Sequence, residues 1–352
     1  MTTSFEPAPA DAASPKRLPL SVIIPTNNES ARIPAFLTSL DRWLDLAEDV
    51  AVVDEYSADG TIELLRSGLY HRRAEFHQRA FGLASAINFG VTQLQSDFIY
   101  IARPGNVITR DGITHLVDTA QHLGCDVLLS PPREDSIQDE AAGREPLPPR
   151  VRWPVEQLLA AAPIVRPRVL RRTSAFHLAL ANALGGRFQS LLGGISSVLF
   201  RADALRARPF DEGCGSISDA LWILQHGLEI SVGVTPQACA SFHAEPEELS
   251  KRERAELRQS KAQAPALAEA AIGAALRATE ASDREDLEGV RRYFEETCAL
   301  LEARGSLSRF RQRDILWFLR PAAWRARTAL KQHQRAWREA ETWLQNRPRW
   351  RE

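Results

Sequence analysis

Two short β-branched runs near the start of the chain, in Ser21–Ser30 and Val50–Thr61, end abruptly in amide and carboxylate side chains. Such groups can form several hydrogen bonds to a polar ligand. In an open parallel sheet, ligands bind outside the carboxyl ends of the strands, where the crossover connections part. The pattern therefore predicts a ligand site, whose candidate residues are Asn27, Asn28, Glu29, Asp54, Glu55 and Asp59.

Alternating strand-like and helical stretches must position these residues. From Leu20 to about Leu129 they follow one another in the manner of βαβ units with right-handed crossovers. The predicted strands are Val22–Ile24, Val50–Val53, Phe98–Ile101 and Val127–Leu129, with further strands at Ser197–Phe200 and Ile230–Val234. The predicted helices are Ala31–Leu46, Gly60–Ser67, Leu83–Leu94, Asp111–Leu123 and Trp153–Leu184. The expected fold class is α/β, a Rossmann-like open twisted sheet, mainly parallel, with helices on both faces.

Composition divides the chain into four parts. Residues 1–17, rich in Ala and Pro, are predicted to be a disordered tail. Residues 18–245 form the α/β domain, within which Pro131–Arg150 is a loop or flap. Residues 246–305 are a helical extension, in which Ser282–Glu285 has the capping-box pattern that opens a helix. Residues 306–352 are a basic, Trp-rich amphipathic tail.

The bulk numbers describe an ordinary globular protein of 352 residues, with 44% hydrophobic residues and a formal net charge of −1. The overall charge therefore indicates no partner, and nucleic acid is not expected. The four cysteines have no C-x-x-C spacing and are predicted to be reduced thiols of a cytoplasmic protein. No apolar run reaches the length of a transmembrane helix, and no secretory signal is recognised.

Five segments, taken in order, resemble the family 2 glycosyltransferases, whose catalytic domain has the GT-A fold. The resemblance extends from about Leu20 to His243 and implies a sugar transferase that uses a nucleotide-sugar donor. VVDEYSADGT is similar to the family's VVDDGSxDGT and differs mainly at Glu55 and Tyr56. The five segments are VIIPTNNE (Val22–Glu29), VVDEYSADGT (Val52–Thr61), GLASAINFG (Gly82–Gly90), GGISSVLFRAD (Gly193–Asp203) and Phe210–Glu212.

The resemblance also implies a donor pocket. Asp54 would accept hydrogen bonds from the base, with Pro25, Asn27 and Glu29 shaping the same pocket. Asp59 has an equally good alternative as the residue that caps the helix beginning near Gly60. Asn88, in the GLASAINFG segment, has packing or capping as its alternative.

The sequence departs from the family at the Asp-x-Asp motif that holds a divalent cation (Mn or Mg) against the donor diphosphate. The matching positions carry Arg103, Gly105 and Asn106, and Asn is a poor sole ligand for a hard cation. Three explanations stay open. Arg103 neutralises the diphosphate directly, without a metal; other groups such as Asp97 or His243 hold the metal; or sugar transfer has been lost.

The catalytic base is the second departure. An inverting transfer needs a carboxylate that takes the proton from the acceptor hydroxyl. The family carries an acidic pair before a helix containing Leu-Trp, and here Asp219 is the one carboxylate at that place. Its alternative is an Asp that simply favours the N-terminus of its helix. For His243, the alternative to a metal ligand is a structural role.

The tail 306–352 carries twelve Arg or Lys against four acids, and five of the eight tryptophans. Trp and Leu recur at helical spacing, and Pro321 is predicted to kink or divide the helix. Such a helix can lie on an anionic membrane surface, which would make the protein peripheral at the inner face of the membrane. It can equally pack against the catalytic domain, form a dimer interface or touch nucleic acid.

The expected function is transfer of a sugar from a nucleotide-sugar donor to a glycan, lipid-linked or small-molecule acceptor, with inversion. The setting implied by the resemblance is surface polysaccharide biosynthesis. The rival is a non-catalytic binding or scaffold protein with a glycosyltransferase-like domain. A nucleotidyltransferase-like enzyme has less support, since the chain lacks a Gly-rich phosphate loop followed by Arg and Lys near its start.

Overall fold

The computed structural model describes residues 17–79, 82–131, 154–184, 190–193, 195–242, 251–278, 281–313 and 321–351. The predicted disordered tail, apart from Arg17, lies outside these ranges. So does the predicted loop Pro131–Arg150, apart from its first residue, and so does His243.

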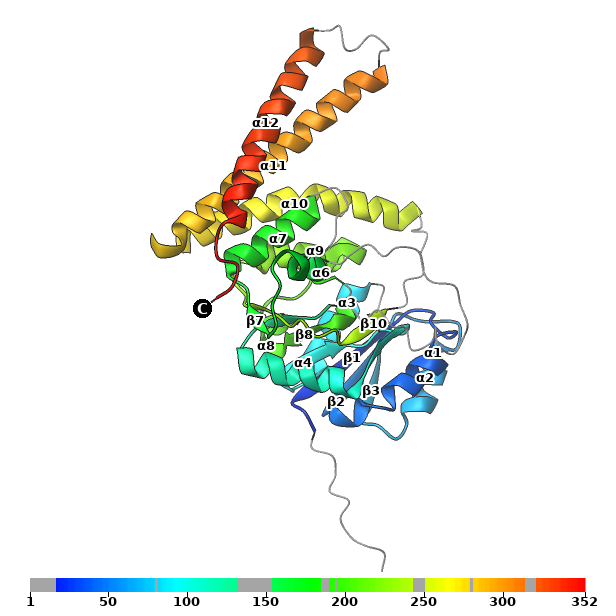
Figure 1. Ribbon diagram of the computed structural model, residues 1–352. Helices are drawn as coiled ribbons and strands as arrows, with labels where there is room; N and C mark the ends of the chain where they lie inside the picture. The colour runs from blue at the N-terminus through cyan, green and yellow to red at the C-terminus, as the bar shows by residue number, and fades with distance from the viewer. Residues whose placement is uncertain are drawn as a thin grey trace, which may run out of the picture.

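An eight-stranded mixed sheet forms the centre of the molecule (Figure 1). Its strand order is β3-β2-β1-β4-β8-β6-β9-β7, and all neighbours are parallel except those of β8 and β7. The strands are β1 (Leu20–Thr26), β2 (Asp49–Asp54), β3 (Ala74–Gln78), β4 (Phe98–Ile101), β6 (Val127–Leu129), β7 (Arg168–Val169), β8 (Val198–Arg201) and β9 (Val232–Val234). A separate two-stranded sheet pairs β5 (Asn106–Ile108) with β10 (Ala240–Phe242) in antiparallel fashion.

Helices cover both faces of the sheet, as predicted. Successive side chains of a strand point to opposite faces, and in β1 Ile23 joins one buried cluster while Val22 and Ile24 join the other. On the Val22 side pack α1 (Ile33–Leu40), α2 (Thr61–Leu69) and α4 (Arg110–Leu123). On the Ile23 side pack α3 (Leu83–Gln93), α6 (Pro154–Ala161), α7 (Arg172–Leu184), α8 (Ala202–Ala207) and α9 (Ser218–His226).

Two predicted helices are shorter in the structure. The stretch Ala31–Leu46 is α1 followed by a short 3-10 turn, Leu44–Leu46. The stretch Trp153–Leu184 is interrupted by β7, so the prediction of one helical stretch was wrong. Pro163 and Pro167 explain the interruption, because proline removes a backbone donor and clashes with the preceding turn of a helix.

Strands β3, β5 and β7 were not predicted. β3 reads AEFHQ and lies at the edge of the sheet with no fully buried residue. β7 has two residues and β5 three, so neither shows the alternation by which strands are recognised.

The C-terminal extension consists of three long helices. They are α10 (Lys251–Ala278), α11 (Ala281–Arg313) and α12 (Pro321–Gln345). Figure 1 shows α10 lying across α7 and α9, while α11 and α12 run as a pair away from the sheet. α11 begins at the predicted capping box, and Pro321 occupies the first position of α12, where a missing N–H is harmless. None of the described helices combines the length and apolar character that crossing a membrane requires.

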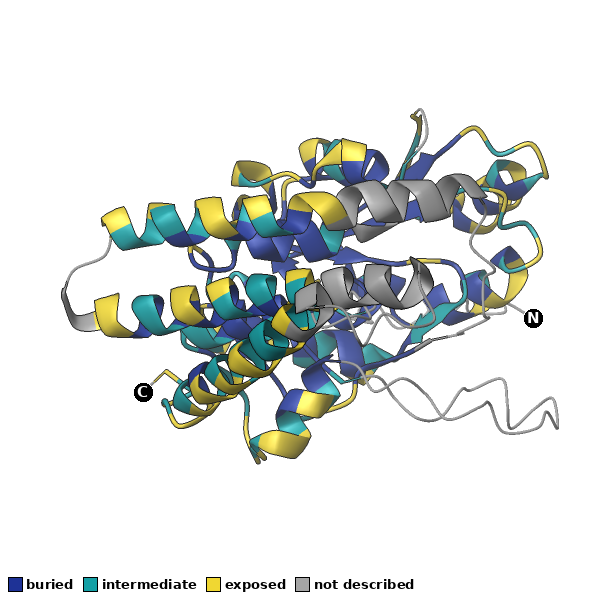
Figure 2. Cartoon of the chain, turned by 90° about the horizontal axis from the view of Figure 1, so that it is seen from above, coloured by how far each residue is buried: buried dark blue, intermediate teal, exposed yellow. Residues whose placement is uncertain are grey.

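The amphipathic stripe of α12 packs within the molecule. Figure 2 colours the chain by burial; among the described residues of α12, Ala340 and Leu344 are buried and the others are half-buried or exposed. Trp337 donates its indole N–H to Thr297 Oγ1 of α11 at 3.1 Å, and Leu344 is buried. His177 of α7 pairs with Glu341 of α12 at 3.0 Å. Of the alternatives for the tail, packing against the rest of the chain is the one that these contacts show.

Candidate active site

The strand order places a crevice at the carboxyl ends of β1 and β4. The chain moves from β1 to β2 and β3 on one side, then crosses to β4 on the other side of β1. Crossovers part at such a switch point, and ligands bind there. β1 ends at Thr26, just before Asn27, and β4 ends at Ile101, just before Arg103. The predicted residues after these strands therefore share one edge of the sheet.

Hydrogen bonds join the loop after β1 to the loop after β2. Asn28, with φ +53°, donates its backbone N–H to Ser57 Oγ at 2.8 Å and accepts from the Ala58 N–H at 3.0 Å through its side chain. Glu29 donates its backbone N–H to Thr61 Oγ1 at 2.8 Å. These contacts fix the backbone of the two loops relative to each other.

Asp59 also takes part in the hydrogen bonds between the two loops. Its carboxylate accepts from Thr61 Oγ1 at 2.6 Å, from the Thr61 N–H at 3.1 Å and from the Ser30 N–H at 2.9 Å. The hydrogen bond from the Thr61 hydroxyl is the main reason that the pKa of Asp59 is held well below its usual value. The N-cap of α2 is Gly60, which has no side-chain cap, so Asp59 is not the capping residue; it joins Thr61 at the start of α2 to Ser30.

Asp54 is fully buried. Oδ1 accepts from Thr26 Oγ1 at 3.0 Å and from Ser57 Oγ at 2.6 Å, and Oδ2 accepts from the Ser57 N–H at 2.9 Å. The carboxylate therefore orders the loop that follows β2. Binding of the base by Asp54 stays a prediction, as do the roles of Pro25, Asn27 and Glu29.

Tyr56 is one of the positions at which the sequence departs from the family pattern. Its φ is +57°, in the left-handed region that glycine adopts without strain. The family pattern has Gly at this position, and a bulky residue there costs about 1–3 kcal/mol. The side chain is 62% exposed.

Glu55 is the carboxylate that the structure turns toward the neighbouring helix and strand. It accepts from the Gly82 N–H at 2.9 Å and from Asn27 Nδ2 at 3.4 Å, and it is 8% exposed. Burial raises the pKa of Glu55, while the Gly82 N–H and the charge of Arg103 act in the opposite direction. Its place directly after a strand was the signal for it in the sequence, but no donor-binding role was predicted for it.

Arg103 and Asn106 occupy the positions of the absent Asp-x-Asp acids. The Asn106 backbone N–H bonds to the Arg103 carbonyl at 3.1 Å, which closes a turn in which Gly105 has φ +91°. Asn106 Nδ2 donates to Ser196 Oγ at 2.6 Å, so its amide helps to hold this turn. The Arg103 side chain is exposed and forms no ion pair with another described residue.

These residues do not fit a divalent cation. Such a cation takes several oxygen ligands, mostly from carboxylates, and the segment 102–106 supplies a guanidinium in their place. Asp97 precedes β4 and is exposed at the opposite end of the strand from Arg103, so the structure does not bring it to the crevice. Within the described ranges, no group of three or more His, Cys, Asp or Glu side chains is arranged to hold a metal.

Asp219 lies in the first turn of α9, partly buried. The Ser190 hydroxyl and the Ala220 N–H donate to it. Burial raises the pKa of Asp219 to about 6, and these hydrogen bonds and the charge of Arg103 oppose the rise. Arg103 thus acts electrostatically on both Glu55 and Asp219, so it links the crevice to the predicted catalytic carboxylate.

Asn88 positions the segment that leads to Asp219. Its side chain accepts from the Phe210 N–H at 2.9 Å and donates to the Phe210 carbonyl at 2.8 Å. Gly90, two residues on, lets α3 approach β1, because a Cβ there would lie 2.9 Å from Ile23 Cγ2. The G-x-x-x-A-x-N-x-G pattern is therefore explained by packing and by this clamp. Sequence reasoning did not identify the clamp, since its partners are 122 residues apart.

Comparisons with known proteins support the same fold. Residues 21–172 match the model of Glycosyl transferase family 2. The chain is similar in structure to S. aureus TarS at 16% identity and a TM-score of 0.52, covering 92% of this chain and 55% of TarS. For S. aureus TarS 1–349 in complex with UDP-GlcNAc the values are 15% and 0.50, covering 92% of this chain and 91% of that one. No curated protein matches the chain.

The likeness to TarS, at such low identity, shows the fold alone, and the family match, which covers residues 21–172, supports the class of enzyme. The match ends at Arg172, so Asn88 lies within it, while its partner Phe210 and Asp219 lie beyond it. Residues 21–172 match the family 2 glycosyl transferases and the fold of the chain is GT-A-like, and together these findings support a glycosyltransferase.

Proposed function

We propose that this protein transfers a sugar from a nucleoside-diphosphate donor, bound in the crevice at the carboxyl ends of β1 and β4, to an acceptor hydroxyl near Asp219. The observation that carries the proposal is the position of Arg103. It is an exposed cation without an ion pair among the described residues, and its charge acts on Glu55 and on Asp219.

Donor binding divides between the two sides of the crevice. On the β1 and β2 side, Asp54 takes the base, and Pro25, Asn27 and Glu29 shape the pocket around it. On the β4 side, Arg103 pairs with the diphosphate, because a guanidinium makes bidentate hydrogen bonds to phosphate oxygens. Arg103 would thereby supply the positive charge that a metal-dependent relative obtains from its cation.

Asp219 acts as the general base. It takes the proton of the acceptor hydroxyl while that oxygen attacks the anomeric carbon of the donor. The bond from this carbon to the diphosphate breaks, and the nucleoside diphosphate leaves with the bonding electrons beside Arg103. One displacement of this kind inverts the anomeric configuration. A carboxyl with a pKa of about 6 is ionised at neutral pH and is basic enough for this step.

The proposed acceptor is a glycan, a lipid-linked sugar or a small molecule. The proposed setting is surface polysaccharide assembly. A similar TarS structure is a complex with UDP-GlcNAc. This makes uridine diphosphate the first nucleotide to test.

A non-catalytic binding role is the second candidate. It is favoured by the absence of a carboxylate from 102–106 and of a second acid beside Asp219. In that case nucleotide binding, or the fold alone, would be retained without turnover.

The test is calorimetric titration of the chain with uridine, guanosine and cytidine diphosphates, each with manganese and with a chelator. Binding of one nucleotide regardless of chelator supports Arg103 as the diphosphate partner. Binding that requires manganese would show that groups other than those at 102–106 hold a metal. Transfer from the matching nucleotide sugar, followed by analysis of the product anomer, separates the enzyme from the scaffold. No binding of any nucleotide would overturn the proposal.

Contact of α12 with an anionic membrane, or with a second copy of the chain, stays a prediction. The exposed side chains of α12 include Arg325, Lys331 and Arg338, which form no ion pair with a described residue. Their triple replacement by Glu should abolish flotation with anionic liposomes, if flotation occurs. It leaves the packed face of α12 intact, so a loss would be due to charge.

A further inference from the structure

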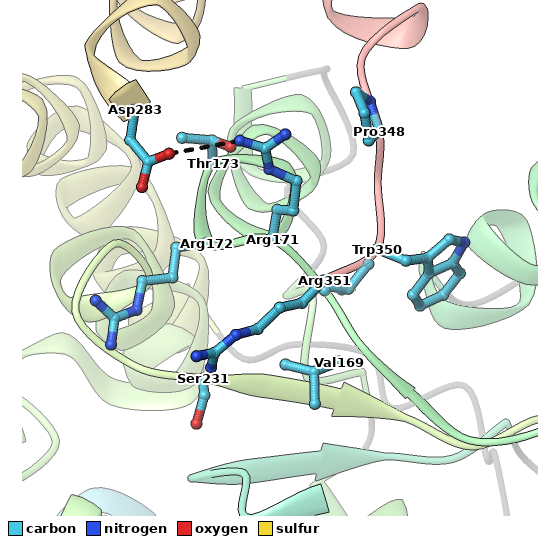
Figure 3. A pocket seen from close by; sticks show the side chains of 10 residues that line it. Val169, Arg171, Arg172, Thr173, Ser231, Asp283, Pro348, Trp350 and Arg351 are labelled. Carbon is cyan, nitrogen blue, oxygen red and sulfur yellow. Dashed lines mark ion pairs between the residues drawn. The ribbon is translucent and has the colours of Figure 1, made fainter. Parts of the chain in front are cut away.

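A cavity of about 500 Å³ lies where the C-terminal segment meets the α/β domain (Figure 3). Its walls come from the end of β7, the start of α7, the residue before β9, the first turn of α11 and the last residues of the chain. The side chains used in the argument are Arg171, Arg172, Thr173, Ser231, Trp350 and Arg351.

The strand register places this cavity at the opposite edge of the sheet from the crevice. β9 is parallel to β6, and both run in the direction of β1 and β4. Ser231 precedes β9, so it lies at the amino ends of the parallel strands, whereas Asn27 and Arg103 follow their carboxyl ends. The cavity is therefore separate from the proposed donor site.

The C-terminal segment is fixed against the sheet at this point. Leu170 and Trp350 form an antiparallel bridge, and the Arg351 N–H donates to the Val169 carbonyl at 2.8 Å. The Arg171 N–H donates to the Arg349 carbonyl at 2.9 Å. Residues 349–351 thus extend the edge of the sheet and hold Arg351 in the cavity wall.

Charges in the cavity are only partly balanced. Arg171 pairs with Asp286 at 2.7 Å and with Asp283 at 3.6 Å, the second pair being the dashed line in Figure 3. Arg172 and Arg351 are exposed, and neither forms an ion pair within the described part of the chain. Figure 3 shows the Arg351 side chain reaching over Ser231, with the Arg172 guanidinium on the same side of the cavity.

Asp126, which lies beside Ser231, is hydrogen-bonded to that residue. Asp126 accepts from the Ser231 N–H at 2.8 Å and from Ser231 Oγ at 2.9 Å. The Ser231 hydroxyl is therefore not a free donor to a ligand, and Asp126 does not neutralise Arg172 or Arg351. Arg172 and Arg351 thus line the cavity without an ion pair among the described residues, while Asp283, the acid in the lining, pairs with Arg171.

We propose that this cavity binds a phosphate-bearing ligand, a phosphate monoester or a diphosphate, between Arg172 and Arg351. Guanidinium groups pair with phosphate oxygens in a bidentate manner. The Thr173 hydroxyl and the first N–H groups of α7, which have no acceptor within the helix, can complete the set of donors. Trp350, whose ring lies 5.6 Å from the Arg168 guanidinium, is also in the lining.

Such a ligand would join two parts of the molecule, since Arg351 belongs to the C-terminal segment and Arg172 to α7. It would therefore stabilise the docking of this segment on the domain. The inference does not rest on the proposed transfer reaction, because it uses none of the residues of the crevice.

The test is thermal unfolding and calorimetry of the full chain titrated with inorganic phosphate, pyrophosphate and glycerol 3-phosphate, with chloride maintaining the ionic strength. One binding site and a rise in unfolding temperature are expected. Arg172→Gln and Arg351→Gln should each weaken binding about tenfold, as expected for one charge-assisted hydrogen bond. Arg338→Gln on α12 should leave the titration unchanged, and Arg103→Gln reports any anion that binds in the crevice instead.

The controls make the outcomes distinct. No binding up to about 10 mM of any of the three anions, or equal binding by the Arg172 and Arg351 variants, would overturn the proposal. If the Arg103 variant alone lost binding, the anion would be in the crevice and the proposal would again fail. Vesicles of phosphatidic acid in phosphatidylcholine identify the source: capture that both cavity variants lose indicates a lipid phosphate, and anion binding without capture indicates a soluble ester.

Discussion

The C-terminal extension and the crevice differ in how their charged side chains are paired. Where the helices of the extension contact their neighbours, charged side chains are paired: His177 with Glu341, His333 with Glu296 at 3.0 Å, and Arg347 with Glu285 and Asp286. Although burial acts in the other direction, the hydrogen bond and charge of His177 hold the pKa of Glu341 below its usual value. In the crevice, burial raises the pKa of Glu55 and of Asp219, and Arg103 has no ion pair among the described residues.

The difference separates residues that hold the fold from residues that await a ligand. The two side chains of an ion pair contribute to the docking of one element on another. Their charges and hydrogen-bonding groups are occupied by each other and are not available to a substrate. A carboxylate with a raised pKa or an exposed cation beside it lowers stability locally, and such groups gather at functional sites. The comparison therefore predicts that changes in the crevice alter activity more than stability, and that changes in the extension do the reverse.

The largest effect is expected from Asp219→Asn. Loss of the general base should lower kcat by about 10²–10⁴-fold, with nucleotide affinity nearly unchanged. Because the ionised Asp219 is desolvated, the variant should be as stable as the wild type or, at pH 7, more stable by about 1 kcal/mol. Asp203→Asn, an exposed acid in the first turn of α8, is the matched control. Unchanged turnover in the Asp219 variant would contradict its assignment.

Arg103→Ala should come next, with nucleoside-diphosphate affinity about 10 to 100-fold lower, since a charge-assisted pair is lost. Arg103→Lys should recover part of the affinity, because Lys keeps the charge without the bidentate geometry. Calorimetry measures both, and Arg42→Ala, an exposed arginine before the Leu44–Leu46 turn, serves as the control. Equal affinity in the wild type and the Ala variant would remove Arg103 from the donor site.

The acid limb of the pH–rate profile should report Asp219. Its carboxyl must be ionised to act as a base, so kcat/KM should fall about tenfold per unit of pH below about 6. Circular dichroism at pH 5 checks that the fold persists. A profile that is flat between about pH 5 and 8 would be incompatible with a base of this pKa.

The smallest expected effect is in the extension, where a substitution should change the free energy of unfolding rather than the activity. A Cβ on Gly289 of α11 would overlap the ring of Trp343 of α12, so Gly289→Ala should destabilise the chain by about 1–3 kcal/mol. In α10, Gly273 has only the flexible end of Arg277 nearby at 3.4 Å, and Gly273→Ala should stabilise by about 1 kcal/mol. Denaturant unfolding measures both free energies. Two changes of the same sign would show that α11 and α12 do not pack as described.

Most of the fold could be predicted from the sequence because its strands are continuous apolar runs. The bounds of β4 and β6 agree with the prediction, and β1, β2, β8 and β9 contain or overlap the predicted runs. The edge strand β3 escaped prediction because its exposed side chains remove the apolar signal. The antiparallel insertion of β8 between β4 and β6 also escaped, since strand direction depends on how the intervening chain returns to the sheet.

The candidate site was predictable residue by residue but not as an arrangement. Asn27, Asp54 and Arg103 could be found because each follows a strand. Their separation from Asp97, which sits at the other end of β4, needed the strand direction. The clamp between Asn88 and Phe210 and the contact of Ser190 with Asp219 join distant segments, so no local pattern indicates them.

The sequence by itself determined the α/β order, the polar ends of the first strands and the replacement of the acidic motif by Arg103. These depend on residue type and on spacing within one or two elements, where backbone sterics and apolar periodicity act. Only the tertiary structure decided that the tail packs on α11 and on the sheet edge at Leu170, and that Arg172 and Arg351 face one cavity. An amphipathic helix can bury its apolar face against several surfaces equally well, and the choice among them is made by the shape and charge of the folded partner.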